Sequence, residues 1–166
     1  MAVPSNEEKI NIYQGIIEKI KKRLPTTNDK SVMYDIVIEE LSKLPHFNWT
    51  GIYEYNESKE ELNLHPNYVG LATEHTKIPK GKGVCGTAVA EDRDVVVEDV
   101  RELDNYIACS VNTRSELVVL IKGAENQILG QIDVDSDEVG AFSEVDRKYS
   151  AKIAALIGKN LERIPR

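Results

Sequence analysis

Apolar residues recur every three or four positions near both ends of the chain, which is the period of helices that pack on one face. At the N-terminus, Ser5 and Glu8 form a capping-box pattern, and the first helix is expected to end before Pro25. A second helix is expected over residues 29–44. The last helix is expected to begin at Ser143 and to carry a single apolar stripe.

Between these helices the period changes to two, which is typical of strands. A hairpin is expected over residues 47–69, with its polar turn at 56–61. A loop over residues 75–83 and a short helix over 84–91 follow. The turn at 123–126 then joins two adjacent antiparallel strands. The later strands are expected over residues 94–100, 116–122 and 127–135.

This order of elements predicts an α+β fold. A central antiparallel sheet would carry the N- and C-terminal helices on one face and loops on the other. The length of 166 residues fits one domain, made of N-terminal helices (1–45), the sheet with its loops (46–142) and a C-terminal helix (143–166). A ligand is expected on the face built from loops.

Charge and composition exclude several classes of function. The formal net charge is −7, which disfavours nucleic acids and anionic membranes as partners, because both need a concentrated positive field. The longest aliphatic run, residues 117–121, is too short to cross a bilayer. The N-terminus lacks the features of a secretory signal, so we expect a cytoplasmic protein in which both cysteines are reduced.

Both cysteines are candidates for chemistry. Cys85 lies among glycines at the start of the expected short helix, where free backbone N–H groups and the helix dipole would stabilise a thiolate. A small buried cysteine in a tight turn is the alternative. A phosphate-binding loop is disfavoured, because the segment lacks the Gly-Lys-Ser/Thr ending. Cys109 lies in the loop 101–114, a placement that leaves an inert and a reactive thiol equally open.

A group of acidic residues is the third candidate. Strand alternation directs Asp133 and Asp135 to one face, and Glu116 begins the neighbouring strand. Carboxylates brought this close raise one another's proton affinity, although they could also be solvent-facing acids at strand ends. On the hairpin, Trp49 and Tyr53 would share a face, as core residues or as a pocket wall.

Metal sites are poorly supported. The acids after residue 132 only partly match a calcium loop, because Glu138 occupies the position that requires glycine. The histidines and cysteines show no spacing familiar from zinc sites. We therefore expect no metal.

Taken together, six segments resemble the free methionine-(R)-sulfoxide reductases, a branch of the GAF domains, and they occur in the order of that family. They are NWTGIY (48–53), GKGVCGTA (81–88), EDV (98–100), IAC (107–109), SELVV (115–119) and IDVDS (132–136). The resemblance runs from about residue 47 to residue 142 and implies a GAF fold.

The resemblance also implies roles for the candidates. Cys109 matches the catalytic cysteine and Cys85 a second redox cysteine. Members commonly carry a third cysteine where this chain has His75, which leaves Cys85 to resolve the intermediate. The residues that match the substrate site are Glu116, Asp133 and Asp135 of the acidic cluster, and Trp49 and Tyr53 of the wall around the methyl end.

The implied activity is thiol-dependent reduction of free methionine sulfoxide, with a thioredoxin-like reductant and no cofactor. Cys109 would attack the sulfoxide sulfur while a protonated carboxyl group donates to the departing oxygen. The alternative is a stand-alone GAF module that binds a small ligand or senses redox state without catalysis. The sequence leaves the oligomeric state open, with a homodimer as one alternative.

Overall fold

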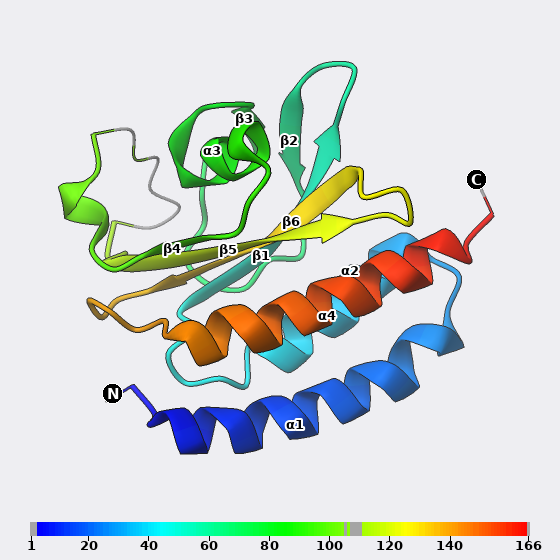
Figure 1. The fold of residues 1–166 in the computed structure, drawn as a ribbon, viewed down its shortest axis with the longest axis horizontal. Coiled ribbons are helices and arrows are strands. Elements are labelled where there is room, and N and C mark those ends of the chain that lie inside the picture. The colour runs from blue at the N-terminus through cyan, green and yellow to red at the C-terminus, as the bar shows by residue number, and fades with distance from the viewer. Residues whose placement is uncertain (1–2, 105, 107–110, 166) are drawn as a thin grey trace.

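The computed structural model describes residues 3–104, 106 and 111–165 (Figure 1). In chain order the elements are α1 (Asn6–Arg23), the 3-10 helix η1 (Leu24–Thr26), α2 (Lys30–Leu41), β1 (Trp49–Asn56), β2 (Glu61–Leu64), β3 (Lys77–Pro79), α3 (Gly83–Glu91), β4 (Val95–Val97), the 3-10 helix η2 (Val100–Glu102), β5 (Ser115–Lys122), β6 (Ile128–Ser136) and α4 (Glu144–Glu162). None of the helices in this part of the chain has both the length and the apolar character needed to cross a membrane.

The strands form one antiparallel six-stranded sheet in the order β3-β2-β1-β6-β5-β4. The long helices α1, α2 and α4 lie on one side of it, and α3 lies on the other side with the connecting loops (Figure 1). The α+β architecture expected from the sequence is therefore confirmed. The capping box expected at Ser5 and Glu8 is present at the start of α1, and a second capping box at Ser143 begins α4.

Alternation along the central strands divides the core in two. Leu117 and Val119 of β5, with Ile132 and Val134 of β6, belong to the core cluster beneath the long helices. The residues between them point to the opposite face, where Val118 belongs to a second core cluster beneath α3. Because a strand directs successive side chains to opposite faces, polar residues at the intervening positions must enter this second layer.

Four elements differ from the sequence-based expectation. The second arm of the hairpin, expected to reach residue 69, ends at Leu64. Residues 77–79, expected in a loop, form β3, whose only apolar side chain to pack inward is Ile78, opposite Leu62 of β2. Three residues are too few to show a period, so no pattern could reveal this strand. The helix expected to reach residue 44 ends at Leu41. The strand expected to reach residue 100 ends at Val97, after which Asp99 caps η2 by accepting from the Arg101 N–H.

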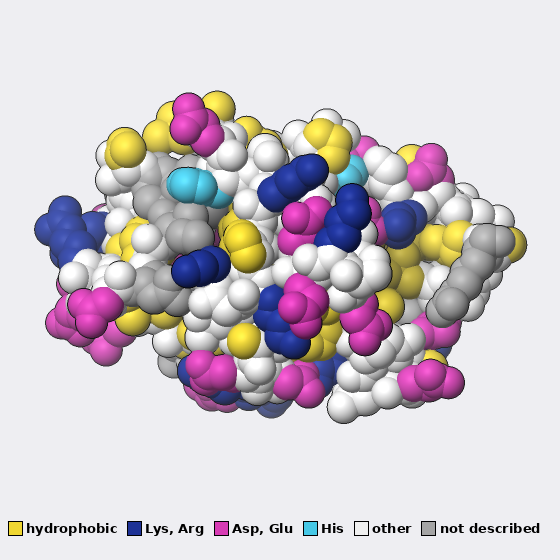
Figure 2. Space-filling view, turned by 90° about the horizontal axis from the view of Figure 1, so that it is seen from above, with side chains coloured by type: hydrophobic (Ala, Val, Ile, Leu, Met, Phe, Trp, Pro, Cys, Tyr) yellow, Lys and Arg dark blue, Asp and Glu magenta, His cyan; other side chains and the backbone are white. Residues whose placement is uncertain are grey.

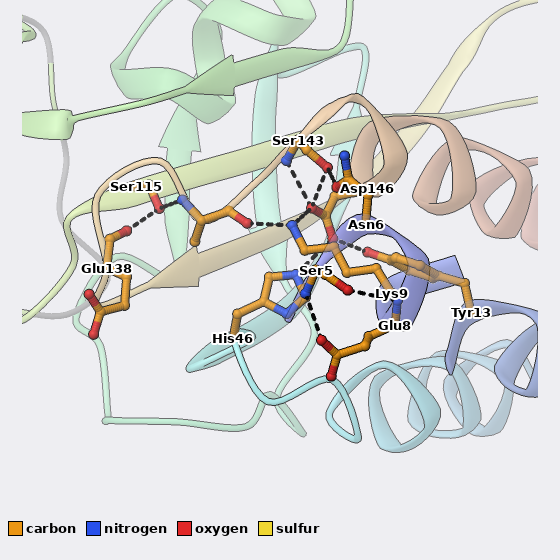
Figure 3. A network of polar contacts seen from close by, with 11 residues as sticks. Ser5, Asn6, Glu8, Lys9, Tyr13, His46, Ser115, Glu138, Ser143 and Asp146 are labelled. Carbon is orange, nitrogen blue, oxygen red and sulfur yellow. Dashed lines mark hydrogen bonds and ion pairs between the residues drawn. The ribbon is translucent and has the colours of Figure 1, made fainter. Parts of the chain in front are cut away.

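A buried ionic network joins the helical layer to the chain just before β1 (Figure 3). Asp146, in the first turn of α4, accepts hydrogen bonds from Lys9 Nζ at 2.6 Å and from the Tyr13 hydroxyl at 2.7 Å. His46 Nε2 lies 2.7 Å from the same carboxylate. Burial by itself would raise the pKa of Asp146, but the contacts with His46 and Lys9 outweigh it and lower the pKa to about 2. The network therefore holds a charged aspartate inside the helical layer.

Replacing Asp146 with asparagine should destabilise the protein, because Lys9 would be left as a buried cation without its counter-ion. We expect the free energy of unfolding at pH 7 to fall by about 3 kcal/mol, measured by urea denaturation. Since the native pKa lies below the unfolded value of about 4, the difference should shrink as the pH falls from about 4 toward 2. The exposed Glu144 in the same helical turn provides the control, and Glu144→Gln should change stability by less than about 0.5 kcal/mol. Equal stability of Asp146→Asn and the wild type would refute this role.

Candidate functional site

Three carboxylates meet on the central strands, on the face away from the long helices. Glu116 of β5 pairs with Asp135 of β6, and Asp133 follows two residues earlier on β6, opposite Val118. The side chains are almost completely buried, with exposed fractions of 2% for Glu116, 0% for Asp133 and 1% for Asp135. The expected sharing of one face is confirmed, and these acids are not solvent-facing residues at strand ends.

Two of these carboxylates have oxygens with unused hydrogen-bonding capacity. Within the described part of the chain, neither carboxylate oxygen of Asp135 has a hydrogen-bond partner, and Glu116 Oε1 also has none. A buried polar group without a partner costs about 1–3 kcal/mol, and more when it is charged. The arrangement therefore favours a ligand that brings positive charge or hydrogen-bond donors.

Burial and mutual repulsion change the protonation of these acids. Burial, followed by the charges of Asp133 and Asp135, raises the pKa of Glu116 well above its ordinary value. Burial and the charge of Asp133 do the same for the pKa of Asp135. Close buried carboxylates share protons because the fully ionised set is unfavourable. The site can therefore offer a carboxylate and a carboxylic acid side by side.

A thiol lies directly above the acids. Cys85 is the third residue of α3, is 4% exposed, and its Sγ donates to Glu116 Oε2 at 3.8 Å. Gln131 Nε2 donates to the Cys85 carbonyl oxygen at 3.0 Å and so attaches α3 to the sheet. Gln131 was not among the residues selected from the sequence, although its position two residues before Asp133 already assigned it to this face.

The aromatic residues of β1 complete one side of the site. Trp49 and Tyr53 are 1% and 0% exposed and share the face of the acids, as expected. Trp49 lies opposite Asp135 in the neighbouring strand, and Gly51 between the two aromatic residues lies opposite Asp133. A Cβ atom at Gly51 would lie 2.5 Å from the indole ring, so glycine is what allows the ring to lie flat over the strand.

Hydrogen bonds fix both aromatic side chains to the loop that follows β2. Trp49 Nε1 donates to the Leu71 carbonyl oxygen at 3.1 Å, and the Tyr53 hydroxyl donates to the His75 carbonyl oxygen at 2.9 Å. A pocket of about 310 Å³ opens beside this wall and is lined by Trp49, Leu71 and Thr113, among others. The hollow is large enough for a small amino acid.

Cys109 lies outside the described residues. Tyr106, which precedes it in the chain, is described and packs against the core cluster that contains Cys85, Trp49 and Tyr53. Its hydroxyl is buried and has no hydrogen-bond partner among the described residues. No sequence pattern indicates Tyr106, because the loop that carries it has no hydrophobic period.

The described groups suit a cation more than an anion. The ligand atoms of Cys85, Glu116 and Asp133 lie within 4.8 Å of one another, close enough for an ammonium group or a metal ion to contact them together. On the outer surface of the loop-bearing face, acidic and basic side chains are interspersed (Figure 2).

The known proteins that are similar to this chain are GAF domain proteins and free methionine-R-sulfoxide reductases. The GAF domain family model matches residues 27–162. GAF domain-containing protein A of Dictyostelium discoideum is 35% identical over 153 residues, 92% of each chain. Free methionine-R-sulfoxide reductase of Escherichia coli is 36% identical over 119 residues, which are 72% of this chain and 69% of that protein. The structure of free methionine-R-sulfoxide reductase from Neisseria meningitidis, in complex with its substrate, is similar with a TM-score of 0.84 and 31% identity, covering 90% of this chain and 88% of that one.

Removing one charge from the acidic cluster should stabilise the protein. The native pKa of Asp135 is raised, so its contribution to stability is fully present below pH 4 and is lost as the pH rises. Asp135→Asn should therefore raise the free energy of unfolding at pH 8 by about 1–2 kcal/mol, with a smaller gain near pH 4. Asp137→Asn is the matched control, because Asp137 is the next acid in the chain and is exposed. Lower stability of Asp135→Asn at pH 8 would contradict the argument.

Proposed function

Because the chain belongs to the GAF domain family and is related to the free methionine-R-sulfoxide reductases, we propose that it reduces free L-methionine-(R)-sulfoxide to L-methionine. The observation that carries this proposal is the set of buried carboxylates beside a buried thiol. A GAF domain that only bound an apolar ligand would have no use for Glu116 and Asp135 in its core, where each costs stability.

The ammonium group of a free amino acid matches this acidic site. It brings positive charge and three N–H donors to carboxylate oxygens that lack partners among the described residues. The amide nitrogen of a peptide-bound residue brings one N–H and no charge. The proposed site thus selects the free amino acid by a group remote from the reacting sulfur.

The chemistry proposed for the site is nucleophilic attack by a thiolate. The Cys109 sulfur bonds to the sulfoxide sulfur while a protonated carboxyl group, on Glu116 or Asp135, donates to the oxygen. The oxygen then passes from the substrate sulfur to the Cys109 sulfur: the substrate S–O bond and the transient S–S bond break, methionine leaves reduced by two electrons, and Cys109 is left oxidised as a sulfenic acid. The Cys85 thiol condenses with the sulfenic acid, releasing water and forming a disulfide that a thioredoxin-like dithiol reopens. The contact between the Cys85 thiol and Glu116 supports this resolving role for Cys85, because a carboxylate beside the thiol can take its proton.

The two thiols should fail at different steps when they are replaced. Cys109→Ser should release no methionine even in a single turnover, since serine is a poor nucleophile for sulfur. Cys85→Ser should release about one methionine per chain and then stop as a sulfenic acid, which dithiothreitol restores but thioredoxin restores poorly. Methionine counted by chromatography after rapid mixing with excess sulfoxide checks this. Full thioredoxin-linked turnover by Cys85→Ser, or a burst from Cys109→Ser, would show that the roles are assigned wrongly.

Blocking the substrate's amino group should abolish efficient reduction. With N-acetylmethionine-(R)-sulfoxide, the acidic oxygens lose a cationic partner, and we expect kcat/KM to fall by at least about a hundredfold relative to the free amino acid. The Asp135→Asn variant should discriminate less between the two substrates. It weakens binding of the free amino acid more than binding of the acetylated one, so the ratio of their kcat/KM values should fall. Equal kcat/KM for the two substrates in the wild type would contradict the assignment of the acids to the ammonium group.

A further inference from the structure

Tyr106 places a hydroxyl group close to the acidic cluster, and its O–H has no acceptor in the described part of the chain. The ring packs against the core beneath α3, and the hydroxyl is buried; among the described residues its O–H has no acceptor, while the Thr113 hydroxyl lies close to its oxygen. Thr113, which lies close to both Tyr106 and Asp135, also has a buried hydroxyl and lines the 310 Å³ pocket beside Trp49. A buried hydroxyl without a partner is costly, so a group oriented in this way indicates an acceptor that enters with the ligand.

The surroundings keep the Tyr106 hydroxyl in its donor form. Burial, followed by the charges of Asp135 and Glu116, raises the pKa of Tyr106. The phenol therefore remains neutral at physiological pH and retains its O–H. Tyr106 always carries the proton that it donates. Glu116 and Asp135, in contrast, can donate only when one of them holds a proton that the acids share.

The chemistry of the substrate restricts which acceptor Tyr106 can meet. The ammonium group has no lone pair to accept a hydrogen bond. The substrate's carboxylate would be repelled by Asp135, Glu116 and Asp133, whose charges all act on Tyr106. The sulfoxide oxygen remains: it is a strong acceptor, it carries no net charge, and it must lie near the acids to receive a proton from them.

We propose that the Tyr106 hydroxyl donates a hydrogen bond to the sulfoxide oxygen and thereby binds the group that distinguishes the substrate from the product. This assignment rests on the proposed function. It makes Tyr106 a second donor to the oxygen, beside the carboxylic acid of the cluster. One consequence is product release, because methionine lacks the oxygen and cannot use this hydrogen bond.

The test compares ligands that differ only at the sulfur. In a Cys109→Ser background, which prevents turnover, calorimetry measures the dissociation constants of L-methionine-(R)-sulfoxide and L-methionine with and without Tyr106→Phe. We expect Tyr106→Phe to weaken sulfoxide binding about three- to tenfold and to change methionine binding less than about twofold. Tyr55→Phe is the matched control, because Tyr55 packs against the same core cluster from β1, and it should leave both constants unchanged.

The other possible results show whether the role of Tyr106 or the proposed function is wrong. Equal weakening of both ligands would assign Tyr106 to the backbone groups of the amino acid or to packing, and no weakening would remove it from the site. Either result overturns the proposal while leaving the reductase function intact, provided that the wild type reduces the sulfoxide. If the parent protein binds neither ligand and the wild type forms no methionine, both proposals fall together. Thermal unfolding of Tyr106→Phe, expected within about 1 °C of its parent, separates a lost contact from a lost fold.

Discussion

Three carboxylates are buried on two adjacent central strands, and the rest of the structure must compensate for the cost of burying them. Glu116, Asp133 and Asp135 are withdrawn from water and repel one another, and two of them keep oxygens without partners in the described part of the chain. The three acids themselves oppose the stability of the sheet. Two apolar layers compensate for them: the cluster beneath α3, which includes Val118, on the same face, and aliphatic residues of the same strands beneath α1, α2 and α4 on the opposite face. The fold can therefore tolerate the charges that it buries.

Two of the buried aspartates, Asp146 and Asp135, show how differently the same side chain behaves in two environments. Asp146 is surrounded by Lys9, Tyr13 and His46, and its pKa is lowered because the charged form is fully satisfied. Asp135 lies in an equally buried position, yet its pKa is raised because burial and a neighbouring acid oppose its charge. The first environment satisfies the aspartate's charge and joins helices. The second becomes complete only when a cation or a proton arrives, which is the physical basis for placing the ligand there.

Much of this arrangement could be predicted from the sequence, because it follows from period and register. The alternation around Ile132 and Val134 was enough to place Asp133 and Asp135 together, and the tight turn after Lys122 was enough to bring Glu116 beside them. Features that depend on tertiary contact could not be predicted. The strand around Ile78 is too short to show a pattern, and the network around Asp146 joins residues that are 100 and 137 positions apart. Tyr106 also gave no signal, because only the fold brings its hydroxyl to the acids.

The most direct test of the central claim is to incubate the protein with racemic free methionine sulfoxide and dithiothreitol and to separate the products by chiral chromatography. We expect L-methionine to accumulate, the (R) epimer at sulfur to be consumed, and the (S) epimer to remain. Recovery of both epimers unchanged, from folded protein with two reduced cysteines, would contradict it and would leave the acidic cluster as the binding site of a GAF module without catalysis.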